Sequence, residues 1–297
     1  VTNGDFSAAG INLVDNPNFT DTGAEAITDG SFPSGTTAWT FGSGWSLGTD
    51  EAICVADGGY DALNQGSVMN SGSSYKVTYT ADLSLITSGT LKLGTFSNSA
   101  TERTVLDGTN TVYLTANGGT FQVNEGGAVG TATITDVSVK ELGADWNDLG
   151  SPLDVASYDE NGLTITSANG DGIGNRVSQS NVVEAATSYK VTYTIHSANL
   201  TGSNTLRYFN GSGYVEMPTA ITGTPQTFYY TTPSTLGNAD WFFRLATTGG
   251  STTDNVTISS ISVQELGEGW TLGTGWSIGE DKAIATSTGG ILSQSIS

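Results

Sequence analysis

The chain has few of the residue types that build several common sites. Its 297 residues include one cysteine, one histidine and only nine Lys and Arg. One thiol and one imidazole cannot form a His/Cys zinc site, an iron–sulfur cluster or an internal disulfide. The 29 Asp and Glu residues bring the formal net charge to -20. This argues against nucleic acid and anionic membranes as partners, because both need clustered Lys and Arg. No apolar run approaches the ~20 residues that span a bilayer.

The residues that are abundant favour β-structure. Glycine accounts for 40 residues, aromatic residues for 9% and charged residues for 13% of the chain. Many turn formers, few charges and frequent Ser and Thr are typical of short strands joined by turns. We find no helical period. The sequence therefore predicts an all-β protein.

Three sequence blocks recur in a fixed order. The matches are residues 39–48 (WTFGSGWSLG) with 270–279 (WTLGTGWSIG), 74–80 with 188–194 (SYKVTYT in both), and 133–143 (TITDVSVKELG) with 257–267 (TISSISVQELG). Such ordered self-similarity indicates tandem copies of one structural unit.

The order of the blocks divides the chain into four parts. Residues 1–28 are an N-terminal extension or the end of a preceding domain. The first repeat covers 29–143 and the second 144–267. Residues 268–297 begin a third repeat and stop before its second block.

The repeated blocks read as strands of a sandwich. Apolar and polar residues alternate along residues 75–80, the pattern of a half-buried strand. In both closing blocks the apolar phase shifts by one residue, which predicts a β-bulge near Asp136 and near Ser260. Each apolar face needs a second sheet to cover it. We therefore predict tandem antiparallel β-sandwich (jelly-roll) domains with a partial third repeat.

With these motifs, the chain resembles jelly-roll domains of the carbohydrate-binding-module (galactose-binding-like) type. More narrowly, it resembles the tandem copies of such domains in phage tail fibres and other virion appendages. The resemblance is carried by residues 270–278, by the SYKVTYT block and by residues 134–142. Family-like openings also occur at residues 3–7 (NGDFS), 16–20 (NPNFT) and 29–32 (DGSF). The resemblance implies the fold and leaves the activity open, because this sandwich hosts many functions.

The resemblance also implies a candidate metal site. Related carbohydrate-binding domains often hold a structural calcium near the aspartate of the closing strand, and Asp136 is the matching residue in the first copy. The second copy has Ser260 in its place. Calcium needs 6–8 oxygen ligands, so a solvated aspartate at a bulge is the simpler interpretation. No other cofactor is expected.

We expect no catalytic residues. His196 aligns with Asp82 in the first copy, and Cys54 aligns with Ala285 in the third. A nucleophile would need a base beside it, and neither residue has an obvious partner in the sequence. The acidic residues lie mostly in turn-like contexts, which solvation explains.

Aromatic residues outside the obvious core positions are candidates for contact with a glycan or with another subunit. In residues 228–230 and 241–243, neighbouring aromatics must point to opposite faces of a sheet, so at least one of each group faces away from its own core. The sequence does not separate sugar contact from subunit contact. The candidates are Tyr60, Tyr113, Tyr158, Tyr208, Tyr214, Tyr230 and Trp241.

The partial third repeat is a candidate assembly element. It is too short to close a sandwich by itself. Either the chain continues past Ser297, or another chain completes the sandwich by strand donation, which would produce a filament. Its apolar residues are Trp270, Leu272, Trp276, Ile278, Ile284 and Ile291.

These observations predict a non-enzymatic structural and adhesive protein of a virion appendage, found on a virion or outside the cell. It would assemble with itself, as a trimer or filament, or with other virion proteins, and would contact host-surface glycan. One alternative is a set of carbohydrate-binding modules from a secreted glycan-degrading enzyme. A second alternative is a subunit of an extracellular filament built by strand donation.

Overall fold

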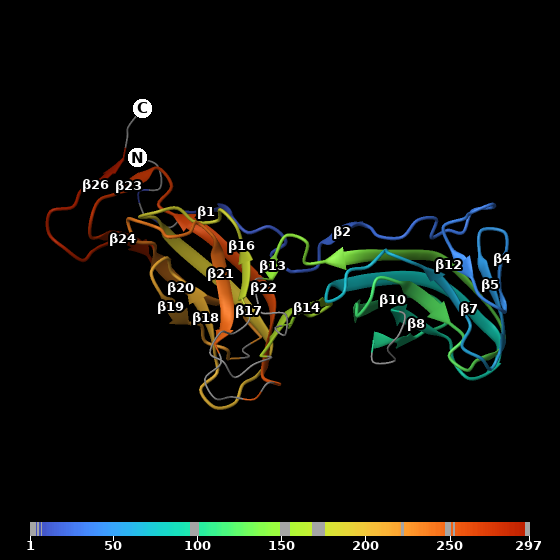
Figure 1. Ribbon diagram of the computed structural model, residues 1–297. Helices are drawn as coiled ribbons and strands as arrows, with labels where there is room; N and C mark the ends of the chain where they lie inside the picture. The colour runs from blue at the N-terminus through green and yellow to red at the C-terminus, as the bar shows by residue number, and fades with distance from the viewer. Residues whose placement is uncertain are drawn as a thin grey trace. The chain divides into compact units, whose positions relative to one another are not determined.

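A computed structural model describes most of the chain as β-strands and turns (Figure 1). The described residues are 4, 6, 8–95, 101–148, 155–167, 176–220, 223–246, 251 and 253–294. Within them no helix is long and apolar enough to cross a membrane. The chain divides into two compact units. The first sandwich comprises Thr20–Ala144 and Ser157–Glu160, and the second comprises Val1–Phe19, Asp145–Ala156 and Asn161–Ser297.

The first sandwich consists of two antiparallel sheets. One contains β2 (Thr22–Glu25), β4 (Trp45–Leu47), β5 (Ala52–Asp57), β7 (Ser74–Ser88), β10 (Gly108–Thr115) and β12 (Val129–Leu142). The other contains β3 (Thr40–Phe41), β6 (Ala62–Gln65), β8 (Lys92–Thr95), β9 (Arg103–Thr104) and β11 (Phe121–Asn124). The strand orders are β10-β7-β12-β5-β4, with β2 beside β12, and β3-β6-β11-β8-β9. Apart from the β8–β9 hairpin, the chain crosses between the sheets at each step from β5 to β12, as in a jelly roll.

The second sandwich repeats this arrangement. One sheet contains β1 (Ala9–Asn12), β14 (Val155–Asp159, of which residues 157–159 fall within the first compact unit), β15 (Gly162–Thr166), β17 (Ser188–Asn199), β20 (Gln226–Thr231) and β22 (Asn255–Leu266). The other contains β13 (Asn147–Asp148), β16 (Arg176–Gln179), β18 (Thr205–Phe209), β19 (Tyr214–Glu216) and β21 (Trp241–Ala246). The orders are β14-β15-β22-β17-β20, with β1 beside β22, and β13-β16-β21-β18-β19. The prediction of tandem antiparallel jelly-roll sandwiches is confirmed.

Four further strands follow the second sandwich. They form two antiparallel pairs: β23 (Trp270–Leu272) with β26 (Leu292–Gln294), and β24 (Trp276–Gly279) with β25 (Lys282–Ala285).

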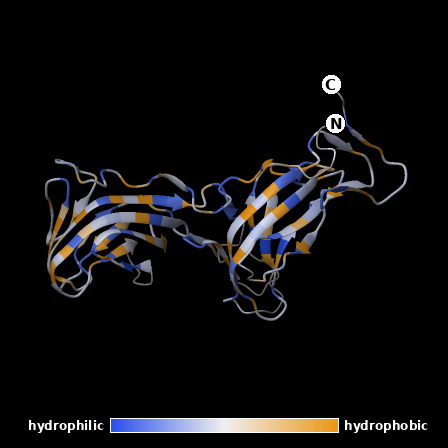
Figure 2. Cartoon of the chain, turned by 180° about the vertical axis from the view of Figure 1, so that it is seen from behind, coloured by the Kyte–Doolittle hydropathy of each residue, from blue (hydrophilic) through white to orange (hydrophobic). Residues whose placement is uncertain are grey.

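The predicted alternation of apolar and polar residues matches the burial pattern along the strands. Along β7, Tyr75, Val77 and Tyr79 are buried in the core, whereas Lys76 and Thr78 are partly exposed on the other face. β17 has the same burial pattern over its first residues. Figure 2 shows apolar and polar residues alternating along the long strands. Burial of β-branched and aromatic residues on one face of each sheet therefore stabilises both units.

The predicted bulges in β12 and β22 are present. The register between β12 and β7 shifts near Asp136, whose φ is 50°, and β22 shifts against β17 over residues 258–260. Each irregularity frees a backbone amide. Val137 N donates to the Gly30 carbonyl at 2.9 Å, and Ile261 N donates to the Pro17 carbonyl at 2.8 Å. At each bulge, the backbone therefore forms a hydrogen bond with a different segment from the N-terminal part of the chain.

In the first sandwich this segment lies at residues 28–32. The Gln65 side chain bonds both backbone groups of Thr28, accepting from its amide at 2.8 Å and donating to its carbonyl at 2.9 Å. The Trp39 indole donates to the Asp29 carbonyl at 3.0 Å. The ring of Phe32 packs on that of Trp39, with 5.0 Å between centroids.

The second sandwich contains the same set of contacts with different residues. Gln179 accepts from the Asp15 amide at 2.9 Å and donates to its carbonyl at 2.7 Å. The Trp146 indole donates to the Asn16 carbonyl at 3.2 Å, and Phe19 packs on Trp146 at 5.1 Å. Residues 15–19 therefore belong to the second sandwich, although they precede the first sandwich in the chain.

A third copy of the ring contact joins Phe6 to Trp270, with 5.0 Å between centroids. The three phenylalanines are evenly spaced in the sequence. Their order in the sequence is the reverse of the order of the repeats that they contact. Phe6 contacts the third repeat, Phe19 the second and Phe32 the first. The N-terminal segment is thus a series of three motifs, each built into a different repeat.

Candidate functional site

The outer face of the sheet β13-β16-β21-β18-β19 carries an unusual set of side chains. Trp241 and Phe243 on β21 are fully buried in the core of the second sandwich. Because side chains alternate along a strand, Phe242 and Arg244 point to the opposite face. That face therefore has an aromatic ring and a guanidinium on its central strand, although neighbouring side chains leave only 7% of Phe242 exposed.

Neighbouring strands extend the aromatic part of this face. The ring of Phe209 on β18 is stacked with that of Phe242, with 4.8 Å between centroids and 11° between planes. Tyr214 on β19 meets both rings, at 5.5 Å from Phe209 and 5.9 Å from Phe242. Offset and edge contacts of this kind hold rings in fixed positions. The three rings form one aromatic cluster.

A row of charged residues lies beside the cluster. In the sheet register Arg176 pairs with Arg244, Arg244 pairs with Arg207, and Arg207 pairs with Glu216. Two of these arginines also lie over aromatic rings. The guanidinium carbon of Arg244 is 3.5 Å from the Tyr214 ring centroid, and that of Arg176 is 5.5 Å from the Phe242 centroid. Such cation–π contacts fix the planes of the guanidinium groups.

The cluster borders a hollow of about 280 Å³. Its polar lining includes Arg176, Asn238 and Asp240. Asn238 Nδ2 donates to Asp240 Oδ2 at 2.9 Å, and the Asn181 backbone amide donates to Asp240 Oδ1 at 3.3 Å. These bonds orient the carboxylate. A small hollow with aromatic walls and a few fixed polar groups has the features of a small-ligand site. The side chains that line it are Arg176, Phe209, Tyr214, Asn238, Asp240 and Phe242.

No family model matches the chain, and no curated protein matches it significantly. Among solved structures, the chain is similar to the N-terminal CBM22-1-CBM22-2 tandem domain of Paenibacillus barcinonensis Xyn10C, with 10% identity, a TM-score of 0.28, and coverage of 87% of this chain and 99% of that one. It is also similar to allantoicase from Saccharomyces cerevisiae, with 10% identity, a TM-score of 0.22, and coverage of 69% and 77%. Similarity this low carries no functional information, and neither description names a virion protein. The virion appendage therefore stays a prediction.

The first sandwich does not repeat the site at the corresponding register positions. Asn124 stands in the position of Arg244. Its register partners Ala62 and Lys92 stand in the positions of Arg176 and Arg207. Gln122 and Gly94 stand in the positions of Phe242 and Phe209. The aromatic cluster is thus a property of the second repeat, and the first repeat supplies a natural control for each residue.

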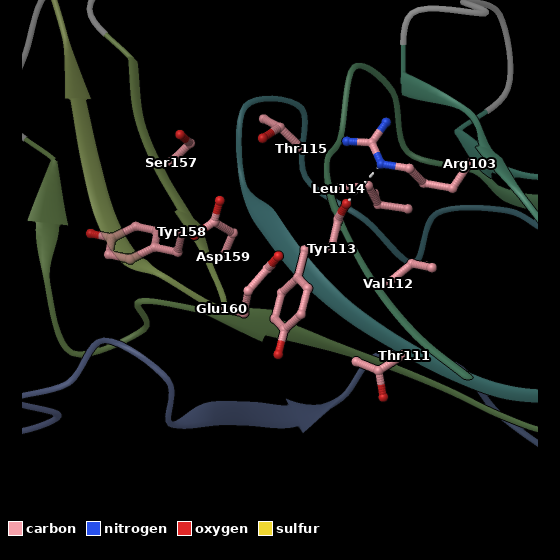
Figure 3. Close-up of a pocket in the computed structure, with 10 residues that line it drawn as sticks. All are labelled: Arg103, Thr111, Val112, Tyr113, Leu114, Thr115, Ser157, Tyr158, Asp159 and Glu160. Atoms are coloured by element: carbon pink, nitrogen blue, oxygen red, sulfur yellow. Dashed lines mark hydrogen bonds between the residues drawn. The ribbon is translucent and has the colours of Figure 1, made fainter. Parts of the chain in front are cut away.

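A larger cleft of about 610 Å³ lies on the first sandwich (Figure 3). Figure 3 shows the Tyr113 side chain beside Glu160, with Arg103 above it. Arg103 Nε donates to the Tyr113 carbonyl at 3.1 Å. Burial, followed by the charges of Glu160 and Asp159, raises the pKa of Tyr113. The cleft is open and rich in acidic groups, and Tyr113 is the one ring there that points toward it, so it is less suited to stacking a ligand than the hollow of the second sandwich.

The other aromatic candidates have different environments. Tyr60 is the most exposed, at 78%, and lies in a loop of the first sandwich. Tyr158 is buried, and in Figure 3 its ring turns away from the cleft. Tyr208, Tyr230 and Trp241 lie in the core of the second sandwich, because they occupy the inward positions of their strands. None of these four rings lines the hollow of the second sandwich. Tyr214 is the candidate that reaches the hollow.

Asp136 is exposed at the bulge of β12. Among the residues that the structure describes, no group of three or more His, Cys, Asp or Glu side chains could hold a metal ion. Thr135 Oγ1 donates to Asp136 Oδ2 at 3.2 Å. The surroundings of Asp136 therefore match those of a solvated aspartate better than those of a calcium ligand.

Cys54 and His196 lie in unlike environments. Cys54 is fully buried, and burial, followed by the charge of Glu125, raises the pKa of its thiol to about 12. The thiol is thus protonated at neutral pH and a poor nucleophile. His196 is exposed. The two residues belong to different units, so they do not form a catalytic pair within either one.

The apolar residues predicted for assembly divide into two groups. Ile278 is buried and its amide donates to Ser188 Oγ at 2.9 Å, and the Trp276 indole donates to the Gly290 carbonyl at 3.0 Å. Trp270 and Leu272 are half-buried on β23. Ile284 and Ile291 remain exposed, at 38% and 73%.

Self-association through the exposed pair stays a prediction. Light scattering after gel filtration should give a mass above that of one 30.6 kDa chain. Replacing both isoleucines by serine should return the mass to that of a monomer. A wild-type monomer would contradict the prediction.

Most of this face is not predicted by the sequence patterns. They indicate Phe242 only as one of three adjacent aromatics, and they do not distinguish Phe209, Arg176 or Arg244. One signal was available: Arg207 and Phe209, like Phe242 and Arg244, are two residues apart, which places the members of each pair on one face of a strand.

Proposed function

We propose that this protein is a non-catalytic glycan-binding protein whose second sandwich binds sugar at the hollow beside Phe209, Tyr214 and Phe242. The observation that carries the proposal is the stacked aromatic cluster on the outer face of a sheet, next to fixed polar side chains. A pyranose has an apolar face of C–H groups and a rim of hydroxyls. Such a molecule needs an aromatic wall and nearby hydrogen-bonding groups.

The polar groups suit hydroxyl recognition. Asp240 is held by Asn181 and Asn238, and a carboxylate oxygen can accept more than one hydrogen bond. Asn238 is exposed at the rim. A volume of about 280 Å³ is just below the range of roughly 300–1,000 Å³ typical of ligand sites. We infer that the hollow accommodates a single sugar unit, with the rest of a glycan extending into solvent.

The aromatic cluster lies on the outer face of its sheet, away from the layer between the two sheets. The core of the second sandwich is formed by the opposite face of the same sheet. At the same positions the first sandwich has Gln122 and Gly94 and still forms its sheet. The fold therefore does not require aromatic residues there, which supports a binding role.

Glycans occur mainly outside cells, so we place this function in an extracellular setting. Carbohydrate-binding modules of a secreted glycan-degrading enzyme need a site of this kind on a sandwich face, and this is the setting we favour.

Phe242→Gln should weaken glycan binding. The substitution introduces the residue that the first sandwich has at this position, so the sheet should form normally. Loss of a central ring in a small binding site corresponds to about 2 kcal/mol, or roughly a thirtyfold weaker affinity. The measurement is a glycan-array screen of the wild-type protein, followed by calorimetric titration of each variant with the strongest ligand.

Tyr60→Ala is the matched control, because it removes an exposed ring from the first sandwich. It should leave the affinity unchanged. Near-ultraviolet circular dichroism shows whether each variant is folded. A glycan whose binding survives Phe242→Gln but is lost in Tyr60→Ala would move the site to the first sandwich. Failure of the wild-type protein to bind any glycan would overturn the proposed function.

A further inference from the structure

The row of arginines on the binding face is unusual for this chain. The protein has nine basic residues and a formal net charge of -20. Three of its four arginines, Arg176, Arg244 and Arg207, occupy adjacent register positions on β16, β21 and β18. Like charges directly opposite each other destabilise a sheet. Their concentration at one place in an acidic protein needs a compensating reason.

Only one of the three has a carboxylate partner among the described residues. Arg207 Nη2 is 3.3 Å from Glu216 Oε1. Arg176 and Arg244 form no ion pair in the part of the chain that the structure describes, and the Nε atom of each is buried without a hydrogen-bond acceptor there. A buried donor without an acceptor costs free energy. Among the described residues, neither Arg176 nor Arg244 therefore has an anionic partner.

Two rings that line the hollow, those of Tyr214 and Phe242, hold these two guanidinium groups. Arg244 lies 3.5 Å above the Tyr214 ring and Arg176 lies 5.5 Å from the Phe242 centroid. Stacking on a ring uses the flat face of a guanidinium and leaves its N–H edges free. Arginine edges bind carboxylates and sulfates through paired, charge-assisted hydrogen bonds. Arg176 also lines the hollow.

We propose that the glycan bound at this site is anionic, with a carboxylate or sulfate group held by Arg176 and Arg244 while the sugar ring stacks on the aromatic cluster. This inference rests on the proposed function and specifies its substrate class. Asp240 also lines the hollow, but its two oxygens accept hydrogen bonds from Asn181 and Asn238. Both of its oxygens therefore have donors other than the arginines.

The test compares ligands that differ only in charge. Trigalacturonate and its methyl ester supply a carboxylate and its neutral counterpart. An oligosaccharide from a sulfated galactan and its desulfated form supply the second pair. Calorimetry on the full chain at low ionic strength should give at least tenfold tighter binding of the charged member in one pair. Preference in the first pair identifies a carboxylate, and preference in the second identifies a sulfate.

The arginine variants assign the preference to this face. Arg244→Asn and Arg176→Ala introduce the residues of the first sandwich, Asn124 and Ala62. Each should weaken binding of the charged ligand by roughly ten- to a hundredfold and weaken binding of its neutral counterpart by a much smaller factor. Lys190→Ala on β17, which removes one positive charge from the other sheet, should change neither.

The outcomes separate the two proposals. If both members of each pair bind equally and Phe242→Gln weakens binding of both, the anionic preference is overturned and the glycan site stands. If the arginine variants weaken charged and neutral ligands alike, the arginines act only on the structure of the face, and the inference is again overturned. If no ligand binds the wild-type protein, both proposals fail.

Discussion

Phe19→Ala is expected to destabilise the second sandwich and to leave the first unchanged, whereas Phe32→Ala should do the reverse. Both phenylalanines are fully buried. Phe19 packs on Trp146 in the second unit, and Phe32 packs on Trp39 in the first. Removing a buried phenylalanine side chain costs about 3–5 kcal/mol. The two residues are close in the sequence, so a purely local view of the chain would predict equal effects on one region.

Hydrogen–deuterium exchange resolved by peptide is the suitable measurement, because it reports on each sandwich within the intact chain. Phe19→Ala should increase exchange in β17 and β22, and Phe32→Ala should increase it in β7 and β12. Tyr60→Ala, on the surface, should increase it in neither pair. If both phenylalanine variants loosen the same sandwich, the assignment of residues 15–19 to the second unit is wrong.

Local patterns in the sequence were enough to predict the strands and their bulges. The alternation in residues 75–80 depends only on which side chains face the core, and a one-residue change of phase marks a bulge regardless of what lies opposite. Both signals are properties of a short segment. For this reason the tandem sandwich fold could be predicted before any contact was known.

The partners of the N-terminal segment could not be predicted in the same way. The three openings at residues 3–7, 16–20 and 29–32 were visible as similar motifs. The segments at the second and third openings are held through backbone groups: carbonyls that accept from Trp146 or Trp39, and amide–carbonyl pairs bonded by Gln179 or Gln65. Backbone groups are alike at every residue, so they carry no sequence signal of their partner. The reverse order of the motifs became evident only from the structure.

The binding face illustrates a related limit. Alternation requires that neighbours in residues 241–243 face opposite sides of a sheet, but it does not say which residue faces the core. That choice depends on the strand register. Gln179 pairs with Trp241, and Gln179 bonds Asp15 on the inner side of the sandwich, so Trp241 points inward and Phe242 outward. Sequence analysis selected Trp241, whereas the residue beside the hollow is Phe242.

Asp254→Ala should destabilise the second sandwich by about 3 kcal/mol. The Asp254 side chain is fully buried. Its carboxylate accepts hydrogen bonds from the Thr201 amide at 2.7 Å, from Thr201 Oγ1 at 2.9 Å and from Asn204 Nδ2 at 2.6 Å. Alanine removes the acceptor and leaves the buried Asn204 amide without this partner. An unsatisfied buried donor costs about 1–3 kcal/mol, and hydrogen bonds to a charged group are stronger than neutral ones. Chemical denaturation followed by tryptophan fluorescence measures the change.

The isosteric variant Asp254→Asn separates the charge from the shape and gives a pH test. Burial raises the pKa of Asp254, but hydrogen bonds from Thr201, Asn204 and Ser251 outweigh it and hold this pKa below its ordinary value of 3.8. The carboxylate therefore stabilises the folded state fully above that ordinary value, and this contribution is lost as the pH falls through the lower, folded-state pKa. The wild-type protein should lose its stability advantage over Asp254→Asn as the pH is lowered below about 4. A constant difference between the two proteins from pH 7 down to pH 2 would show that the buried network does not depend on the charge of Asp254.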